Sequence, residues 1–204
     1  MQTVALAQAT GGVVTAVDLH AEFLDQLRER AEVAGLLERI HVMQADMRDL
    51  PYEPHSFDLV WCEGAAYIMG IREALTEWRR FLRPSGYVAF SEIVSCADDP
   101  PAELHDFFTA EYAGMTDVAG NLARARSAGY EVIGHFTLPD SAWWDAYYTP
   151  LEAKLPGLVV KYAGDETALG VVESTRKEID LRRRYADDYA YELFVVRRRD
   201  AQGA

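Results

Sequence analysis

Acidic residues stand at or near the carboxyl ends of apolar runs in the first half of this 204-residue chain. A carboxylate in such a position can accept hydrogen bonds from two neighbouring hydroxyl groups, orient a substrate or take up its proton. Because parallel strands bring their carboxyl ends to one edge of a sheet, acids placed in this way would line a ligand crevice. The acids in question are Asp18, Asp46, Glu63 and Glu92.

Strands and helices alternate in the region that carries these acids. Val13 to Val17 is a continuous apolar run with β-branched residues, typical of a strand buried on both faces. Apolar residues at helical spacing follow it, and Gly35 ends that helix. The alternation predicts a doubly wound α/β sheet with right-handed crossovers. Helices are expected at 3–9, 23–34 and 74–82, and strands at 13–17, 40–44, 57–62 and 87–93.

The pattern changes after Ser95. Asp98-Asp99-Pro100-Pro101 breaks the chain, and helical stretches follow. Residues 141 to 163 are rich in aromatic side chains and predict helix in pieces, with Pro150 and Pro156 as interruptions. The remaining expected elements are helices near 101–113, 117–128 and 165–186 and strands at 130–136 and 189–197.

Several motifs together resemble the class I S-adenosylmethionine-dependent methyltransferases. The resemblance is carried by Val14-Thr15-Ala16-Val17-Asp18, Gln44-Ala45-Asp46-Met47, Ser56-Phe57-Asp58-Leu59-Val60 and Phe81-Leu82-Arg83-Pro84-Ser85-Gly86. It covers residues 1 to 93 as motifs, and the small-molecule branch similar to the ubiquinone/menaquinone methyltransferases fits best. The resemblance implies a Rossmann-like, mostly parallel sheet whose last strand is antiparallel, with a helical insertion after the fifth family strand.

The resemblance also implies how the cofactor, S-adenosylmethionine, would be held. Asp18 would accept the ribose hydroxyls, and Leu19 would lie against the adenine ring. Asp46 would accept the adenine amine, while the backbone N–H of Met47 meets a ring nitrogen. Glu63 would contact the methionyl end of the cofactor or the acceptor. The alternative for both aspartates is structural, as an acid at a helix start or in a turn.

Four residues are candidates for acceptor binding. Tyr67 follows the fourth family strand, and Glu92 ends the next as a candidate base or orienting group. Trp143 and Tyr147 belong to an aromatic cluster that would suit an apolar or cationic small molecule. The alternatives are core packing for the aromatic residues, a homodimer interface for the cluster and a solvated carboxylate for Glu92. No catalytic residue and no metal site is predicted.

The first strand and the glycine-rich loop of the resembled family would precede residue 3. We therefore expect a single methyltransferase-like domain over 1–204 that lacks roughly 40 to 50 residues at its N-terminal end, judged from typical domain size. Within it, 1–95 would be the cofactor-binding half, 96–163 the acceptor side, and 164–204 the final helix and strand. The alternative is a natural variant in which another segment fills the gap.

Composition restricts the partners. The net charge of −13 disfavours nucleic acid as a substrate, and the Asn/Asp-Pro-Pro-aromatic motif of nucleic-acid amino methyltransferases is absent after residue 62. No apolar run is long enough to cross a membrane, and the two cysteines favour a cytoplasmic location. We expect methyl transfer to a small-molecule acceptor. The alternatives are a non-catalytic remnant acting through protein contacts, or a nicotinamide-dependent oxidoreductase, since Gly11-Gly12 and Asp18 are also compatible with a dinucleotide site.

Overall fold

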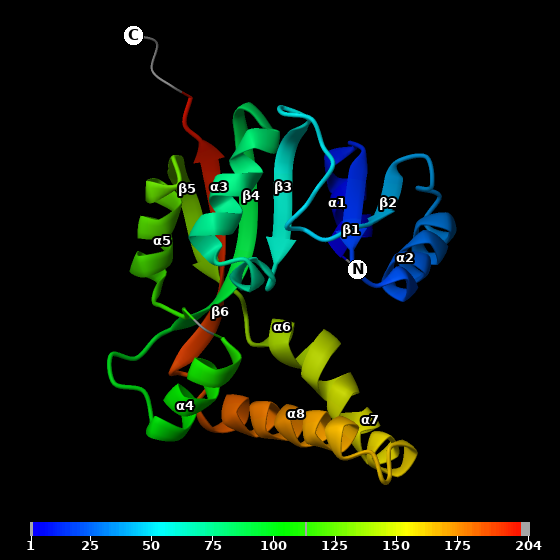
Figure 1. The fold of residues 1–204 in the computed structure, drawn as a ribbon, viewed down its shortest axis with the longest axis vertical. Helices are drawn as coiled ribbons and strands as arrows, with labels where there is room; N and C mark the ends of the chain where they lie inside the picture. Colours follow the sequence, from blue (N-terminus) through cyan, green and yellow to red (C-terminus); the bar gives the residue numbers. More distant parts are fainter. Residues whose placement is uncertain (1, 113, 201–204) are drawn as a thin grey trace. The chain divides into compact units, whose positions relative to one another are not determined.

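The computed structural model describes residues 2–112 and 114–200. The chain divides into two compact units, Met1–Glu53 (unit 1) and Pro54–Ala204 (unit 2), which Figure 1 shows in the blue end and in the remainder of the ribbon. The single domain over 1–204 stays a prediction.

Unit 1 is a two-stranded parallel sheet with two helices. In chain order it contains α1 (Gln2–Thr10), β1 (Val14–Asp18), α2 (Ala21–Val33) and β2 (Ile40–Gln44). The strands pair in register from Val14 opposite Ile40 to Asp18 opposite Gln44, so both end at the same edge. The buried core of unit 1 is small and comprises Ala7, Ala31, Leu36 and Ile40.

Strand β1 is less buried than its sequence suggests. A strand buried on both faces was expected over 13–17, but Val13 lies outside β1 and is 65% exposed, and all residues of β1 are half-buried. Among the described residues, β1 has one hydrogen-bonded neighbour, β2. The apolar run 57–62, which its composition would also place in a buried strand, is likewise less buried, because Leu59 and Trp61 are exposed and that strand also has a single neighbour among the described residues.

Unit 2 holds a four-stranded sheet and most of the helices. Its first half contains β3 (Phe57–Glu63), the 3-10 turn η1 (Ala66–Ile68), α3 (Ile71–Phe81), β4 (Leu82–Ser95), α4 (Ala102–Glu111) and α5 (Val118–Ser127). Its second half contains β5 (Tyr130–Thr137), α6 (Ser141–Trp143), the π-helical turn η2 (Trp144–Tyr148), α7 (Thr149–Lys161), α8 (Glu166–Arg184) and β6 (Tyr189–Arg198).

The sheet of unit 2 has the strand order β3-β4-β6-β5. Strand β4 is parallel to β3, whereas the last strand, β6, lies between β4 and β5 and is antiparallel to both. The rings of Phe90 and Phe194, which are paired in register, stack at 5.0 Å and are fully buried. The predicted α/β fold with an antiparallel last strand is confirmed.

The helices of unit 2 form two groups around its sheet. Helices α3 and α5 lie side by side against the sheet, and α3 buries Ala74, Leu75 and Trp78 at helical spacing. Helices α4, α7 and α8 gather beyond one end of the sheet (Figure 1). There they share a core with Ile93 of β4 and Tyr189 of β6.

Two local predictions need correction. Pro156 was expected to interrupt a helix, but it lies inside the continuous α7. Proline removes only one backbone donor, and burial of Leu155, with Leu158 against the same core, holds the turn. Leu82 was expected on the helix, yet α3 ends at Phe81 and Leu82 begins β4 with an extended ψ of 137°, just before Arg83, where the following Pro84 favours extended backbone.

Leu82 gives a test of this core. Its side chain is fully buried, so Leu82→Ala should lower the free energy of unfolding by about 2–5 kcal/mol through lost burial and a residual cavity. Val160→Ala on α7 is the control, because Val160 is 78% exposed and should change stability by less than about 0.5 kcal/mol. Urea unfolding followed by circular dichroism measures both, and an unchanged midpoint for Leu82→Ala would contradict the assigned packing.

Candidate functional site

The loops after β1 and β2 are tied together in unit 1. The backbone N–H of Ala45 donates to the carbonyl of Asp18 at 3.1 Å. The side-chain amide of Gln44 donates to the carbonyl of Leu19 at 2.9 Å. These bonds fix the backbone that carries Asp18 and Leu19 against the end of the neighbouring strand.

Asp18 retains a free carboxylate oxygen. Its Oδ1 accepts the backbone N–H of His20 at 2.8 Å, while Oδ2 accepts no hydrogen bond from any residue that the structure describes. The residue is half-buried, and the adjacent Leu19 is 54% exposed. Oδ2 of Asp18 can therefore accept a hydrogen bond from a polar group of a ligand ring, while the side chain of Leu19 packs against a flat apolar face of the same ligand.

Asp46 is held differently. The guanidinium of Arg48 donates to both of its carboxylate oxygens, with Nε at 3.0 Å from each and Nη2 at 2.7 Å from Oδ2. The backbone N–H of Arg48 adds a bond of 2.9 Å to Oδ1. Together these contacts hold the pKa of Asp46 below its usual range. This is the turn geometry that the sequence left open, so any new donor must share the carboxylate with Arg48. Met47 is half-buried.

A tight turn follows β3 in unit 2. The carboxylate of Glu63 accepts the indole N–H of Trp61 at 2.6 Å. Gly64 has a φ of 56°, and its N–H donates to the carbonyl of Ser91 at 2.9 Å. A Cβ at this position would lie 3.0 Å from the Tyr191 hydroxyl, so both conformation and space favour glycine. The turn leads directly into η1, which carries Tyr67.

Glu92 is the most perturbed acid of unit 2. Its side chain is fully buried, Oε1 accepts the backbone N–H of Tyr67 at 3.1 Å, and Oε2 has no hydrogen-bond partner among the described residues. Burial raises the pKa of Glu92 to about 7, against the opposing effect of backbone N–H groups and of the Arg124 charge. Near neutral pH this carboxyl can therefore exist in both protonation states.

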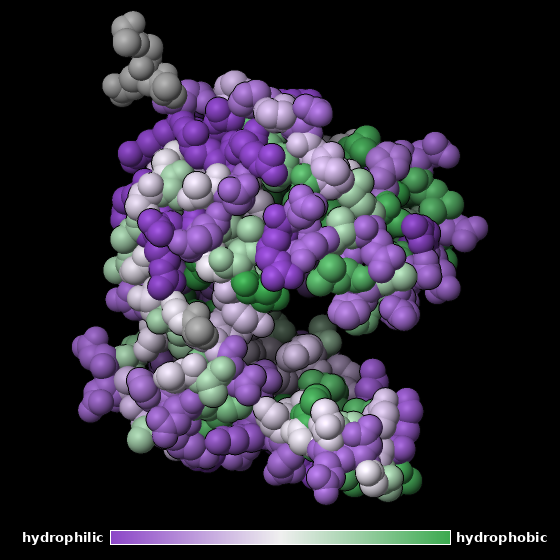
Figure 2. Space-filling view, in the orientation of Figure 1, coloured by the Kyte–Doolittle hydropathy of each residue, from purple (hydrophilic) through white to green (hydrophobic). Residues whose placement is uncertain are grey.

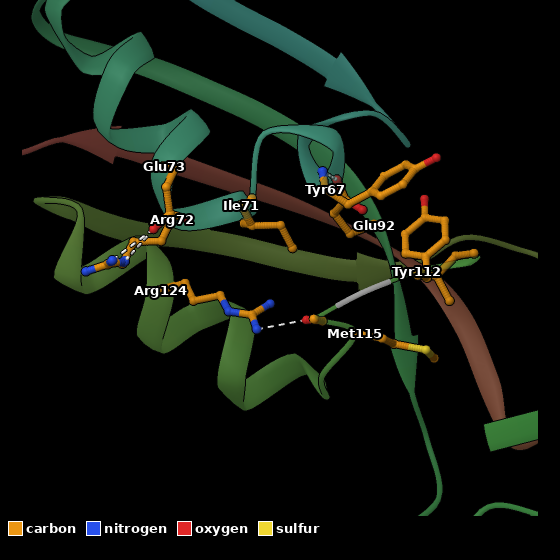
Figure 3. Close-up of a pocket in the computed structure, with 11 residues that line it drawn as sticks. Tyr67, Ile71, Arg72, Glu73, Glu92, Tyr112, Met115 and Arg124 are labelled. Carbon is orange, nitrogen blue, oxygen red and sulfur yellow. Dashed lines mark hydrogen bonds and ion pairs between the residues drawn. The ribbon is translucent and has the colours of Figure 1, made fainter. Parts of the chain in front are cut away.

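Tyr67 and Glu92 line one cavity of about 250 Å³ (Figure 3). The rings of Tyr67 and Tyr112 stack with 3.8 Å between their centroids. Arg124 of α5 is fixed by the carbonyl of Gly114 at 2.8 Å and by the Asn121 side chain at 3.0 Å. The apolar part of the lining comes from Ile71, Ile93 and Met115, and Arg72 and Glu73 complete the charged part.

The other predicted residues lie elsewhere. Trp143 is 3% exposed and packs in the helical core, with its ring 4.7 Å from that of Tyr191 and the guanidinium of Arg182 over it at 4.4 Å. Tyr147 is 52% exposed and packs against Tyr148. Neither residue lines the cavity. Their placement matches the core-packing alternative for Trp143, while a role for Tyr147 in acceptor binding stays a prediction.

Of the cavity lining, sequence reasoning identified only Tyr67 and Glu92, and Tyr112 and Arg124 are the most informative of the residues that it missed. Tyr112 was grouped only with the aromatic residues of the helical region, although its place at the end of α4 brings it back to η1. Arg124 gave no signal, because an arginine on an amphipathic helix is ordinary at a surface. Only the packing of α5 beside α3 places it at the cavity.

Other chemistries find little support in the described part of the chain. No group of three or more His, Cys, Asp or Glu side chains there could hold a metal ion. Burial raises the pKa of the Cys62 thiol to about 12, which leaves it protonated at neutral pH. Within the same residues, no helix has both the length and the apolar character that a membrane span requires.

Comparison with known proteins gives consistent matches. Residues 1–90 match the family model described as a methyltransferase domain. Methyltransferase GfsG of Streptomyces halstedii is 33% identical over 133 residues, which are 63% of this chain and 48% of that protein. A ubiquinone/menaquinone biosynthesis C-methyltransferase of Brucella canis is 34% identical over 84 residues, 39% of this chain and 31% of the relative. The chain thus spans less than half the length of either relative.

A solved structure extends the likeness to nearly the whole chain. A methyltransferase of Geobacter sulfurreducens, crystallised with S-adenosylhomocysteine, superposes with a TM-score of 0.79 over 96% of this chain and 79% of that one, at 21% identity. At this identity the match establishes the fold. Together with the sequence matches, it confirms the predicted resemblance to class I S-adenosylmethionine-dependent methyltransferases of the small-molecule branch.

The titration of Glu92 gives a prediction about stability. Its folded pKa of about 7 lies above the unfolded value of 4.5, so the native state binds more protons between these values. Its contribution to stability is present at low pH and is lost as the pH rises through this window, by about 2–3 kcal/mol between pH 5 and pH 8.

Glu92→Gln should remove this part of the pH dependence while keeping the bond from the Tyr67 N–H. Urea unfolding of both proteins at the two pH values measures it, because the titration of other groups cancels in the comparison. Equal pH dependence in the two proteins would mean that Glu92 titrates normally.

Proposed function

We propose that this chain, a relative of the class I S-adenosylmethionine-dependent methyltransferases, transfers a methyl group from S-adenosylmethionine to a small-molecule acceptor. The observation that carries the proposal is the methyltransferase-domain match of residues 1–90, which includes Asp18 with its free carboxylate oxygen at the end of β1. The predicted cytoplasmic location belongs to the same proposal, supported by the free cysteines Cys62 and Cys96.

The residues of unit 1 fit the nucleoside part of this cofactor. Oδ2 of Asp18 is an available acceptor for a ribose hydroxyl, and exposed Leu19 offers an apolar surface for a base. Asp46 and the backbone N–H of Met47 would contact the adenine edge, with Asp46 sharing its carboxylate with Arg48. Glu63 is proposed for the methionyl end, on the resemblance alone.

The cofactor, when bound, supplies a methyl group already activated by a sulfonium, so the protein mainly needs to position the acceptor and exclude water. Tyr67 and Tyr112 supply a stacked aromatic wall, and Ile93 and Met115 add apolar surface. Oε2 of Glu92 is unpartnered within the described chain and can accept a hydrogen bond or a proton from an acceptor O–H or N–H group. Arg124 offers a fixed positive charge.

These features define the acceptor that we propose. A cavity of about 250 Å³ takes a small molecule or one end of a longer one. The aromatic wall favours a flat or cationic group, and Glu92 favours an acceptor with an exchangeable proton. A homodimer is a further part of the proposal that rests only on the exposed aromatic side chain of Tyr147.

Asp18→Ala tests the cofactor contact. Loss of one hydrogen-bonded carboxylate should weaken S-adenosylhomocysteine binding about fivefold to 150-fold. Asp25→Ala on α2 is the control, since Asp25 is an exposed acid paired with Arg28, and its affinity should match wild type. Equilibrium dialysis measures all three proteins. Unchanged affinity for Asp18→Ala would remove Asp18 from the site.

Glu92→Gln tests the acceptor side. An acceptor is first identified by screening small molecules for formation of S-adenosylhomocysteine. If Glu92 accepts the acceptor proton, the variant should lose about 100-fold in kcat, and the rise of wild-type activity through pH 7 should be absent. Cofactor affinity should be unchanged. A variant with a wild-type rate and pH profile would restrict Glu92 to a structural role.

A further inference from the structure

A second hollow lies at the other end of the sheet in unit 2. It is an open groove of about 570 Å³ at the start of β3 and the end of β6. Phe57 and Glu63, at opposite ends of β3, place it about 20 Å from the cavity of Tyr67 and Glu92 at the usual rise of a strand. Its polar lining consists of His55, Thr76, Arg79, Arg80, Ser127 and Arg198.

The charge of this groove is opposite to that of the chain. The whole protein carries −13, yet the groove is lined by three arginines and by no acidic residue. Two of the arginines have a counter-charge nearby: Arg80 forms an ion pair with Glu77 at 3.5 Å, and Nε of Arg198 lies 4.0 Å from the Asp200 carboxylate. Figure 2 shows strongly hydrophilic side chains over this end of the sheet.

The Asp200 carboxylate is already used by Ser85, which donates from its hydroxyl at 2.9 Å and from its backbone N–H at 3.2 Å. Arg79 forms no ion pair within residues 2–112 and 114–200. The positive charge of the groove therefore exceeds the negative charge beside it.

Two of the arginines are held in place by backbone carbonyls. Arg198 donates to the carbonyls of Leu82 and Arg79, and Arg79 donates to that of Arg199. The Nε atoms of both side chains are buried without a hydrogen-bond partner in the described chain. Two guanidinium groups fixed in this way carry donor capacity that the described protein leaves unused.

Gly129 makes this arrangement possible. A Cβ at position 129 would lie 2.9 Å from Nε of Arg79, and the residue has a φ of 87°, so glycine satisfies both the space and the conformation. The close approach of Arg79 to the turn before β5 is thus built into the fold.

We propose that this groove binds a phosphate group, either inorganic phosphate or the phosphate of a small phosphorylated molecule. Planar guanidinium groups match the oxygens of phosphate in pairs, whereas the hydroxyls of Thr76 and Ser127 already donate to the carbonyls of Arg72 and Arg124. The groove and the cavity lie at opposite ends of the sheet, so this site is separate from the proposed methyl transfer and stands independently of it.

Calorimetric titration of the whole chain with sodium phosphate and with glycerol 3-phosphate, at constant ionic strength set by sodium chloride, tests the proposal. Saturable binding of either ligand is expected, and tighter binding of the ester would identify a phosphorylated molecule as the source. Arg79→Gln should weaken binding about tenfold or more. Thr76→Glu should do the same by adding a carboxylate at an exposed helix position while all three arginines remain.

Arg197→Gln is the matched control. Arg197 neighbours Arg198 on β6 but pairs with Glu131 and does not line the groove. Arg197→Gln removes the same charge from the chain as Arg79→Gln but leaves the lining of the groove intact. The phosphate affinity of this variant should therefore stay within about twofold of wild type. Absence of saturable binding, or equal weakening by Arg197→Gln and Thr76→Glu, would overturn the proposal. Circular dichroism confirms that each variant is folded.

Discussion

The hydrogen bond from the Tyr67 backbone to the buried carboxyl of Glu92 organises the candidate site. It joins the turn after β3 to the end of β4, and the turn can reach that position because Gly64 adopts a positive φ beside Tyr191. The bond satisfies one carboxyl oxygen and leaves the other unpartnered in the described chain. Burial of this group is unfavourable for its charged form, and the same burial gives it a pKa suited to proton exchange near neutral pH.

Much of the fold could be predicted from local patterns. Helical spacing identified α2, and a run with β-branched residues identified β1, because each pattern is set within one element. The antiparallel position of β6 came from the family resemblance instead. Burial of whole strands was predicted less well, since Leu59 and Trp61 are apolar but exposed. The number of neighbours of a strand is a property of the sheet, which residue type alone does not report.

The residues of the candidate site could be predicted where a functional side chain lies at or just after the end of a strand. Tyr67 follows β3, Glu92 lies near the carboxyl end of the neighbouring β4, and the two do meet in one cavity. Tyr112 and Arg124 could not be found in this way, because their helices reach the cavity through packing between elements distant in sequence. Trp143 was predicted to bind the acceptor because it belongs to an aromatic cluster, yet its side chain lies in the helical core. Asp18 and Asp46 stand in similar positions in the sequence, but of the two only the Asp46 carboxylate accepts hydrogen bonds from a neighbouring arginine side chain.

The central claim is that this chain uses S-adenosylmethionine, and calorimetric titration of the purified protein tests it most directly. S-adenosylmethionine and S-adenosylhomocysteine are titrated alongside NAD, which has an adenosine moiety as well and so controls for general nucleoside binding. The account predicts saturable, micromolar binding of the two sulfur compounds, about −8 kcal/mol in binding free energy, and none of NAD. Binding of NAD alone would indicate an oxidoreductase. Binding of none of the three by a folded protein would contradict the proposed activity and favour a domain that acts through protein contacts.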